Sequence, residues 1–570
     1  MKENFWRIKE QGDPNDVDHL SKALKINKTL ANLLVQRGIR TYSEAETFFR
    51  PEKSQLHDPF LMKDMDKAVS RIERAISNNE RVLIYGDYDV DGTTAVAVVY
   101  SFLKPLCQQL EFYIPNRYEE GYGVSFKSID YAATNHISLI ITLDCGIKAI
   151  DRVCYAASKG IEFIICDHHY TGEKLPEACA VLNPKRPDCC YPYKHLSGCG
   201  VGYKLIQALA LHMNLSQEMV MKHLDLVAVS IASDIVPITG ENRVLAFMGL
   251  DKINSNPGVG IASIIKIAGL EQKRITIDDI VFKIGPRINA AGRMDTGEEA
   301  VKLLTAEVPG EAMQIGENID EYNKQRKSID QILTSEALQM IESDPEQSAR
   351  KTTVLFNPHW NKGVIGIVAS RLIESYYRPT VILTESNGFA SGSARSVEGF
   401  DLYSAIDRCS HLLENFGGHM YAAGITLKVE NIPAFKQQFE EIVAKTISEE
   451  QTTPVIEIDT QIELGDITPK FYRILKQFEP HGPENSQPVF LTKNVVDNGN
   501  GRTVGGNGEH LRLELIQEST PFEPIQAIGF QMGSHFNYIK TGNPFDICYT
   551  IDENEFRGNI SRQIKIKDIK

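Results

Sequence analysis

Three aspartates stand at alternate positions directly after a short apolar run. They are Asp87, Asp89 and Asp91, within the stretch LIYGDYDVDGTTA. Carboxylates this close together repel one another, so the cluster either turns towards water or surrounds a cation. A turn rich in Asp and Gly is the simpler interpretation. A metal site is the more specific one, and other parts of the sequence help to decide between them.

Acidic and imidazole side chains also follow three further apolar runs. LIITLDCGI contains Asp144, FIICDHHY contains Asp167, His168 and His169, and LVAVSIASDIVP contains Asp234. Each of them alone has an ordinary explanation, because an Asp after a strand often caps the next helix. Together, carboxylate and imidazole ligands suit Mn²⁺, Mg²⁺ or Zn²⁺, and the mixture favours Mn²⁺ over Mg²⁺. Two ions ~3.5–4 Å apart would neutralise the carboxylates and promote phosphoryl hydrolysis.

The runs that carry these side chains predict a parallel sheet. Between residues 79 and 306, short apolar segments alternate with segments of helix length, and they lack the polar alternation of half-exposed strands. Ligands of such α/β domains gather at the carboxyl ends of the strands, which is where the polar clusters stand. We therefore expect the chemistry-bearing residues in a single site.

The rest of the chain divides into four further segments. We expect a helical accessory segment at 1–78, a long amphipathic connecting helix at 307–346, a second α/β domain at 347–448 and an all-β domain at 453–570. In the last segment, several short strands with alternating apolar residues predict a small barrel, with an oligonucleotide-binding (OB) fold as one candidate. The predicted fold class is α/β with a C-terminal β-barrel.

The composition is typical of a globular protein, with 42% hydrophobic and 24% charged residues. No apolar run reaches the ~18 residues of a membrane span, and the first residues lack a signal-peptide core. We therefore expect a cytoplasmic protein with no membrane partner. The formal net charge of −14 gives no general attraction for nucleic acid, so binding to nucleic acid would need a local basic site.

Ten cysteines are scattered along the chain, as in proteins of a reducing compartment. Cys179, Cys189, Cys190 and Cys199 lie close together in sequence, which raises the alternative of a structural zinc ion. Their spacing differs from the CxxC pairs of common zinc sites, so this alternative is the less favoured one.

The motifs resemble those of a known superfamily, and they occur in the same order. DYDVDG, TLDCGI, CDHH and ASDIVP are similar to the four successive motifs of the DHH phosphoesterases. Within that superfamily the chain resembles the bacterial RecJ family of single-strand-specific 5′→3′ DNA exonucleases. The stretches that carry this closer resemblance include IPNRYEEGYGV, GCGVGYKL, GPRINAAGRM, GVIGIVASRL and FGGHMYAAG. It extends from about residue 30 to at least residue 560 and covers every predicted domain.

The resemblance implies roles for individual residues of the DHH domain. It implies that two Mn²⁺ or Mg²⁺ ions are held by Asp87, Asp89, Asp144, His168 and Asp234, with Asp144 bridging them. His169 is similar to a residue that lies beside the scissile phosphate, and Asp167 is expected to orient the histidine pair. Asp91 is expected in a supporting role.

The second α/β domain resembles the DHH-associated domain. There the resemblance implies a phosphate-binding Gly-Gly-His motif at Gly417, Gly418 and His419, and a 5′-phosphate site that includes Ser393 and Arg395. Arg287 and Arg293 are further candidates for phosphate contacts, and a salt bridge with a carboxylate is the alternative for Arg293.

The barrel offers less specific signals. Phe490, Lys493, Arg502 and Phe530 are candidate DNA contacts, and each could equally lie in the core or on a solvated surface.

The resemblance implies a 5′→3′ exonuclease that acts on single-stranded DNA and releases 5′-mononucleotides in DNA repair and recombination. It also implies a monomer, and a helicase and a single-strand-binding protein are candidate partners that the sequence does not itself identify. Two alternatives stay open: a DHH phosphodiesterase for short RNA or cyclic dinucleotides, and a non-catalytic scaffold in replication. The length of the chain argues against the first, and its intact candidate ligands argue against the second.

Overall fold

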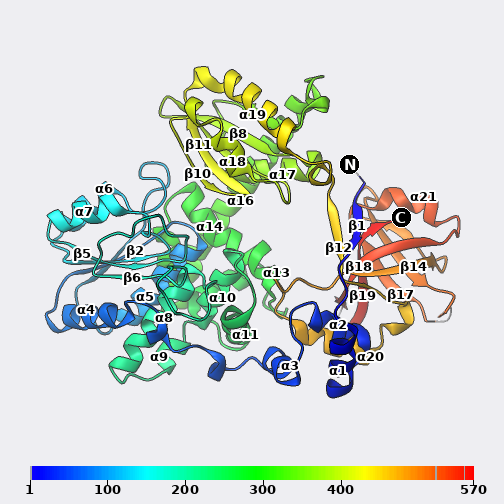
Figure 1. Ribbon diagram of the computed structural model, residues 1–570, viewed down its shortest axis with the longest axis horizontal. Helices are drawn as coiled ribbons and strands as arrows, with labels where there is room; N and C mark the ends of the chain where they lie inside the picture. The colour runs from blue at the N-terminus through cyan, green and yellow to red at the C-terminus, as the bar shows by residue number, and fades with distance from the viewer. Residues whose placement is uncertain (1–2, 520–522, 557–558) are drawn as a thin grey trace. The chain divides into compact units, whose positions relative to one another are not determined.

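The computed structural model describes residues 3–519, 523–556 and 559–570 (Figure 1). The chain forms two compact units. One is Pro51–Thr452, and the other combines Met1–Arg50 with Thr453–Lys570. Within the described residues, no helix is both long enough and apolar enough to cross a membrane.

The first unit contains a five-stranded parallel sheet in the order β3-β2-β4-β5-β6. Its strands are β2 (Val82–Gly86), β3 (Leu110–Tyr113), β4 (Leu139–Leu143), β5 (Glu162–Cys166) and β6 (Ala180–Leu182). β2 and β4 are buried along their whole length, as expected of apolar runs in a sheet that is covered on both faces. Because all neighbouring strands run parallel, their carboxyl ends meet at one edge.

Helices cover both faces of this sheet (Figure 1). Ile84 and Ile141 pack on one face with α4 (Met65–Ser77), α5 (Val90–Leu103), α8 (Gly198–His212) and α10 (Leu224–Ser233). Leu83 and Ile140 pack on the other face with α6 (Phe126–Thr134) and α7 (Ile150–Ser158). Successive side chains of a strand point to opposite faces, which places Leu83 and Ile84 in different cores. The same region holds α9 (Glu218–Met221), α11 (Gly240–Ser255), α12 (Val259–Ile267), α13 (Ile277–Asp279), a π-helical turn (Ile280–Ile284), α14 (Gly285–Met294) and α15 (Glu298–Leu304).

A 34-residue helix, α16 (Pro309–Glu342), leads from this region to the second α/β domain. At ~1.5 Å per residue it is about 50 Å long. Its last turns contribute Leu333, Ala337 and Ile341 to a core that they share with α17 (Ile365–Tyr376). The predicted long connecting helix is confirmed.

The second α/β domain is built on a mixed sheet in the order β10-β11-β9-β8-β7. Its strands are β7 (Thr353–Phe356), β8 (Thr380–Ser386), β9 (Phe389–Arg395), β10 (Asn415–His419) and β11 (Ala422–Leu427). β7 and β8 are parallel, and the other neighbours are antiparallel. One face packs through Ile382 on α17, and the other packs through Val381 and Leu383 on α18 (Leu402–Asp407) and α19 (Ile432–Thr446).

In the second unit, strands close into a barrel in the order β14-β18-β19-β17-β16, and Val496 of β14 pairs with Ile516 of β16 to complete the ring. β13 and β15 extend this sheet at its two ends. The strands are β13 (Thr460–Gln461), β14 (Phe490–Asp497), β15 (Arg502–Val504), β16 (His510–Ile516), β17 (Ile525–Gly529), β18 (Phe545–Phe556) and β19 (Asn559–Ile569). The predicted OB-like barrel is confirmed.

The barrel unit also contains the first 50 residues of the chain. α1 (Pro14–Leu24), α2 (Lys28–Val35), α3 (Tyr42–Phe49) and α20 (Pro469–Leu475) contribute to its core, and α21 (Phe536–Ile539) adds a short turn. β1 (Phe5–Ile8) pairs in parallel with β12 (Val455–Ile458). α4, in contrast, packs on the parallel sheet of the first unit. The segment 1–78 is therefore divided near residue 50, because the apolar faces of its helices fit two different cores.

Candidate active site

The polar clusters of the first unit meet at the carboxyl edge of the parallel sheet. Asp87 follows β2, Asp144 follows β4 and Asp167 follows β5. These strands are neighbours, so their last residues are neighbours as well. Asp234 reaches the same place from the end of α10. The single site that the sequence predicts is thus a consequence of the strand order.

His168 lies at the centre of this site. Its Nε2 is 3.1 Å from Asp144 Oδ1, 3.6 Å from Asp234 Oδ2 and 3.7 Å from Asp91 Oδ2. Its Nδ1 is 3.0 Å from the carbonyl oxygen of Leu196, which can only accept a hydrogen bond. The proton therefore belongs on Nδ1, and the lone pair of Nε2 faces the carboxylates.

Asp167 accepts hydrogen bonds from both histidines. Its Oδ1 accepts hydrogen bonds from the backbone N–H groups of His168 (2.7 Å) and His169 (3.0 Å) and from His169 Nδ1 (2.8 Å). Its Oδ2 accepts from the N–H of Ile147 at 2.9 Å. Burial works against ionisation of Asp167, but the hydrogen bond and charge of His169 outweigh it and keep the pKa below its usual value. Asp167 is thus engaged in orienting the histidines.

Asp91 is anchored to the first turn of α8. Its oxygens accept from the N–H of Gly198 (2.6 Å), the N–H of Cys199 (2.8 Å) and Ser230 Oγ (2.7 Å). These hydrogen bonds are compatible with a supporting role for Asp91, which stays a prediction. Asp91 also belongs to one of two groups with the spacing of metal ligands, which are Asp144 with His168 and His169, and Asp91 with His168 and Asp234.

Several buried acceptors of this site have no hydrogen-bond partner among the described residues. They are both oxygens of Asp87, Asp144 Oδ1, His168 Nε2 and Asp234 Oδ2. Burial, reinforced by neighbouring carboxylates, raises the pKa of Asp87 and of Asp144 well above the usual value. Burial also lowers the pKa of His168 to about 4, so its imidazole is neutral and free to ligate. Unpartnered carboxylates and a neutral imidazole fit divalent cations of the Mn²⁺ or Mg²⁺ kind.

The backbone around Asp144 leaves little room for movement. Asp144 has a positive φ of 58°, in the left-handed region that non-glycine residues seldom adopt. Gly198, the first residue of α8, lies directly against it: a Cβ on Gly198 would come within 2.5 Å of Asp144 Cβ. Glycine is therefore required at this point of α8 for the helix to approach the carboxylate.

A group of arginines lies beside the carboxylates. Arg395 Nη1 donates to Ser393 Oγ at 2.9 Å, and Arg293 Nη1 donates to the carbonyl of Gly363 at 2.8 Å. Burial and the charges of Arg117, Arg326 and Arg395 lower the pKa of Arg293 to about 9.

In the described part of the chain, Arg117, Arg293 and Arg395 form no ion pair with a carboxylate. Their hydrogen bonds and ring contacts go to neutral groups, such as the Tyr88 ring 4.9 Å from Arg117. Guanidinium groups left without a counter-charge are suited to a phosphate ligand.

Comparison with known proteins agrees with this geometry. Three family profiles match: the DHH family N-terminal domain over residues 81–231, the DHHA1 domain over residues 350–445 and the RecJ OB domain over residues 458–568. The single-stranded-DNA-specific exonuclease RecJ of Bacillus subtilis is 36% identical over 566 residues, which cover 99% of this chain and 70% of that protein. The chain belongs to the RecJ family.

Solved RecJ structures share the fold along the chain. The crystal structure of RecJ from Thermus thermophilus in complex with Mn²⁺ matches with a TM-score of 0.85 at 26% identity, covering 99% of this chain and 79% of that one. The complex of the same protein with Mg²⁺ matches with a TM-score of 0.78 at 25% identity, covering 99% and 78%. Both ions named in these structures are ones that the unpartnered acceptors here would fit.

The Gly-Gly-His motif lies on β10, the edge strand of the second α/β domain. Gly418 has a φ of 150°, and a Cβ there would come within 2.3 Å of the carbonyl of Ala422, so only glycine fits. Burial lowers the pKa of His419, and so do the charges of His169, Lys148 and Lys185. The end of β10 thus lies close to the metal-ligand candidates.

Arg287 is engaged elsewhere. Its Nε donates to Asp320 Oδ1 of α16 at 2.9 Å, and its Nη1 donates to the carbonyl of Lys283 at 2.7 Å. The salt bridge that the sequence offers as an alternative for Arg293 is instead found at Arg287.

Sequence reasoning missed two residues of this site, Arg117 and Tyr122. The hydroxyl of Tyr122 lies 3.2 Å from His169 Nε2 and 3.4 Å from the carbonyl oxygen of Asp144. Arg117 lies over Tyr88, the residue between Asp87 and Asp89. Both belong to IPNRYEEGYGV, a stretch that carries the family resemblance, and that resemblance was the signal that could have found them.

The cysteine cluster forms no metal site in the described residues, where the groups with ligand spacing contain Asp and His alone. Cys189 Sγ accepts a hydrogen bond from the N–H of Lys63 at 3.5 Å, and Cys190 is exposed. The less favoured zinc alternative has no support in this geometry.

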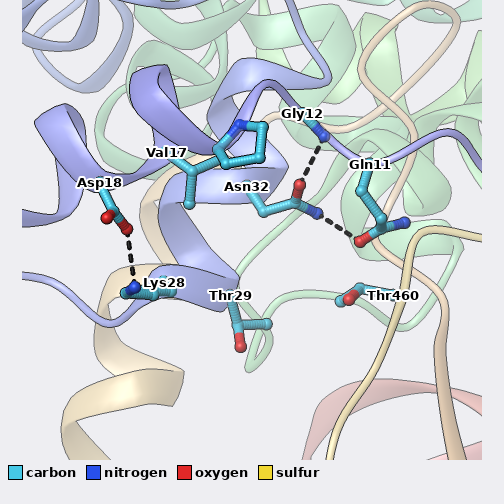
Figure 2. Close-up of a pocket in the computed structure, with 9 residues that line it drawn as sticks. Gln11, Gly12, Val17, Asp18, Lys28, Thr29, Asn32 and Thr460 are labelled. Carbon is cyan, nitrogen blue, oxygen red and sulfur yellow. Dashed lines mark hydrogen bonds and ion pairs between the residues drawn. The ribbon is translucent and has the colours of Figure 1, made fainter.

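The barrel unit has a hollow of about 320 Å³ between its N-terminal helices and Thr460 (Figure 2). The amide of Asn32 accepts from the N–H of Gly12 at 2.8 Å and donates to Gln11 Oε1 at 3.0 Å. Figure 2 marks both hydrogen bonds. At the other end of the hollow, Lys28 pairs with Asp18 at 2.7 Å. These polar groups of the lining are paired with one another by hydrogen bonds and an ion pair, so we assign no ligand to the hollow.

Proposed function

We propose that the protein degrades single-stranded DNA from its 5′ end in a metal-dependent reaction and releases 5′-mononucleotides during DNA repair and recombination. The observation that carries the proposal is the adjacency of two kinds of unpartnered charge. Buried acceptors of Asp87 and Asp144 suit divalent cations, and the unpaired guanidinium of Arg117 suits phosphate. The charge of Arg117 acts on the pKa of Asp87, so the two sets adjoin.

The arginine group would hold the terminal 5′-phosphate. Ser393 Oγ already lies 2.9 Å from Arg395 Nη1, so both can turn towards one phosphate. Arg117 and Arg293 would add charge-assisted hydrogen bonds from the side of the parallel sheet. Binding of the terminal phosphate at a fixed distance from the carboxylates places the first phosphodiester over them, and this arrangement sets the 5′→3′ direction.

We assign Asp87, Asp89, Asp144, His168 and Asp234 as the residues that would hold two Mn²⁺ or Mg²⁺ ions, as the family resemblance implies. Asp87, Asp144, His168 and Asp234 have buried acceptors without a hydrogen-bond partner among the described residues. Asp91 shares ligand spacing with His168 and Asp234. When bound, such ions would act as Lewis acids that activate water and stabilise charge on the reacting oxygens. Asp144 would serve both ions, as the family resemblance implies: its Oδ1 is buried, has no hydrogen-bond partner among the described residues and lies 3.1 Å from His168 Nε2.

His169 would contact the scissile phosphate. Burial opposes its charged form, but the hydrogen bond to Asp167 outweighs burial and raises the pKa of His169. The proton on Nδ1 is held by Asp167, so Nε2 faces Tyr122 and is the atom that would meet the substrate. From Nε2, a protonated His169 donates a hydrogen bond to a non-bridging oxygen and stabilises the charge that develops there. His419 would donate to another such oxygen from β10.

In the barrel, Phe530 is the best-placed candidate for stacking on a base. This residue is 50% exposed, and Lys565 Nζ lies 5.7 Å from its ring centroid. Lys493 and Arg502 are exposed and could follow the phosphate backbone. Phe490 is fully buried in the barrel core, and we remove it from the candidate contacts.

The proposal is tested by digesting single-stranded DNA labelled at its 5′ or its 3′ end, with Mn²⁺ and then with EDTA. We expect labelled mononucleotide to appear at once from the 5′-labelled substrate and only late from the 3′-labelled one. Release from the 3′ end, or activity that survives chelation, would contradict the proposal. Preference for short RNA or cyclic dinucleotides would favour another DHH phosphodiesterase, and absence of hydrolysis would favour a scaffold.

We further propose that the chain acts as a cytoplasmic monomer, alongside a helicase that supplies single strands and a single-strand-binding protein that coats them. The specificity for single strands supports the need for such partners. Light scattering on the purified protein measures its mass, and a dimer would contradict the monomer. The domain limits near residues 306, 347 and 453 predict that limited proteolysis cuts first near these positions. Residue 79 should resist, because it lies between α4 and β2 of one core.

A further inference from the structure

The carboxyl edge of the parallel sheet has two flanks. β3 lies at one end of the strand order and β6 at the other, with β2, β4 and β5 between them. Arg117 follows β3, and Lys185 follows β6. The metal-ligand candidates that follow β2, β4 and β5 therefore lie between an arginine flank and a lysine flank.

The second α/β domain repeats this order. Arg395 lies at the end of β9. Burial and the charge of Arg117 lower its pKa, and burial and the charges of Arg117 and Arg395 lower the pKa of Arg293. His419 lies at the end of β10, and burial and the charges of His169 and Lys185 lower its pKa. β11 lies between β9 and β10 in the sheet. Arg395 and His419 lie at one edge of this second sheet, because both pair with Ala422 of β11. The charge of Arg117 thus acts on the pKa of Arg395, and that of Lys185 acts on the pKa of His419.

An aromatic and cationic pair stands on this second flank. Lys185 Nζ lies 4.9 Å from the ring centroid of Tyr170, the residue directly after the two histidines. Tyr170 is 64% exposed. An exposed aromatic ring beside a cation is the combination that binds single-stranded nucleic acid, because the ring stacks on a base and the cation meets a phosphate.

The pair is tied to the catalytic histidines through the backbone. The N–H of Lys185 donates to Asn183 Oδ1 at 2.8 Å, and Asn183 Nδ2 donates to the carbonyl of His169 at 2.9 Å. Lys185 has no ion pair with a carboxylate in the parts of the chain that the structure describes. Burial lowers its pKa, while the charges of Asp234 and Asp167 oppose that change. A partly desolvated ammonium group without an ion-pair partner is suited to an incoming phosphate.

We propose that Tyr170 and Lys185 form a subsite for the strand that the enzyme retains after cleavage. Tyr170 stacks on a base on the 3′ side of the scissile bond, and Lys185 pairs with a phosphate of the same segment. The inference rests on the proposed function, because the terminal phosphate at the arginine flank is what directs the rest of the strand across the carboxylates to this flank. Loss of the pair therefore weakens the hold on the retained strand, and the carboxylate site stays intact.

The test measures removal of the first nucleotide from 5′-phosphorylated thymidine decamers that carry one abasic residue at position 2, 3, 4 or 5. We expect the wild type to lose about tenfold in kcat/KM at one of these positions, the size of a single stacking contact. On the intact decamer, Tyr170→Ala should have a kcat/KM about tenfold below that of the wild type. Removing the base at the sensitive position should then change the kcat/KM of Tyr170→Ala by less than twofold. Tyr170→Phe keeps the ring and should behave like the wild type.

Lys185 is tested in the same way with single methylphosphonate linkages, which remove the charge of one phosphate. Lys185→Met should be insensitive to one linkage that weakens the wild type, and Lys185→Arg should restore the sensitivity. In binding assays, Lys185→Met should reduce the slope of log K against log salt by about 0.7, the value of one phosphate contact in single strands.

Lys159 provides the matched control. It lies 4.7 Å from the ring centroid of Tyr155, but it precedes β5, at the amino ends of the strands, and it pairs with Asp130. Lys159→Met should leave every profile unchanged. The inference is overturned if both variants of the pair keep wild-type sensitivity at all positions, or if Lys159→Met reproduces their effect. A wild type that does not digest from the 5′ end would instead contradict the proposed function.

Discussion

Replacing Gly198 by alanine should strongly reduce hydrolysis, because the new methyl group pushes on Asp144. The added Cβ would lie 2.5 Å from Asp144 Cβ and 2.6 Å from Asp144 Oδ1. Ordinary contacts of this kind begin at 3.4 Å, so the first turn of α8 and Asp144 must separate by about 0.9 Å. The contact is with the first carbons of Asp144, which rotation of its side chain cannot carry away.

Asp144 can give way only together with its surroundings. Its N–H donates to the carbonyl of Cys166 at 2.9 Å, and its backbone already has a positive φ. A misplacement of ~1 Å in a catalytic site costs about 100-fold in rate, and overpacking of this kind costs about 1–3 kcal/mol of stability. We therefore expect kcat/KM to fall about 100-fold and the protein to remain folded.

Gly200→Ala is the matched control, two residues further along the same turn. A Cβ on Gly200 would lie 3.3 Å from Ser197 Oγ and 3.4 Å from Leu196 Cβ, close to ordinary contact. The assay is the initial rate of nucleotide release from 5′-labelled single-stranded DNA with Mn²⁺, together with the melting temperature of each variant. Activity of Gly198→Ala within twofold of Gly200→Ala would refute the reasoning.

Three further predictions concern metal, ion pairing and pH. Asp144→Ala should abolish hydrolysis while DNA binding persists, and Mn²⁺ should raise the melting temperature of the wild type more than that of the variant. Lys204→Met should lower the free energy of unfolding by about 3–5 kcal/mol. The reason is that Glu241 stays buried without the ammonium group that now lies 2.9 Å away. His223 is buried, and burial lowers its pKa to about 3. When the pH falls from 7.5 to 5, the free energy of unfolding of His223→Leu should therefore rise by about 2 kcal/mol relative to that of the wild type.

The sign of the pH effect follows from the unfolded state. Unfolded His223 takes up a proton below about pH 6.5, whereas the folded protein does not until about pH 3, so acid favours unfolding of the wild type. Urea unfolding at the two pH values measures the difference, and an equal loss in wild type and His223→Leu would contradict it. For the ion pair, adding Glu241→Gln to Lys204→Met should recover part of the stability, and a strictly additive double variant would exclude coupling. Retained turnover in Asp144→Ala would remove that residue from the metal ligands.

Much of the fold and part of the site could be predicted because their signals are local. The apolar runs before Asp87, Asp144 and Asp167 mark buried parallel strands, and chain direction alone places these residues at the carboxyl ends. The alternation of Leu511, Leu513 and Leu515 marks the barrel in the same way. Periodicity over a few residues is enough for such assignments, because burial of one face or of both faces depends on neighbours in sequence.

The rest depends on partners that are distant in the chain. Whether an arginine is free for phosphate depends on which carboxylate the fold brings to it: Asp320 reaches Arg287, and no carboxylate of the described chain forms an ion pair with Arg293. Whether Phe490 contacts DNA or fills a core depends on how the barrel closes. The spacing of residues in the sequence therefore cannot predict which arginine forms an ion pair or which aromatic side chain is buried.

The sequence by itself determined the chemistry of this protein: oxygen and imidazole ligands at strand ends, and a fold that gathers them. The tertiary structure decided how the charges are distributed around that chemistry. The strand order placed Arg117 and Lys185 on opposite flanks of the carboxylates, and the packing of α8 brought Gly198 against Asp144. The physical reason is that ligand type is a property of single residues, whereas the flank on which a charge lies is a property of how distant segments pair.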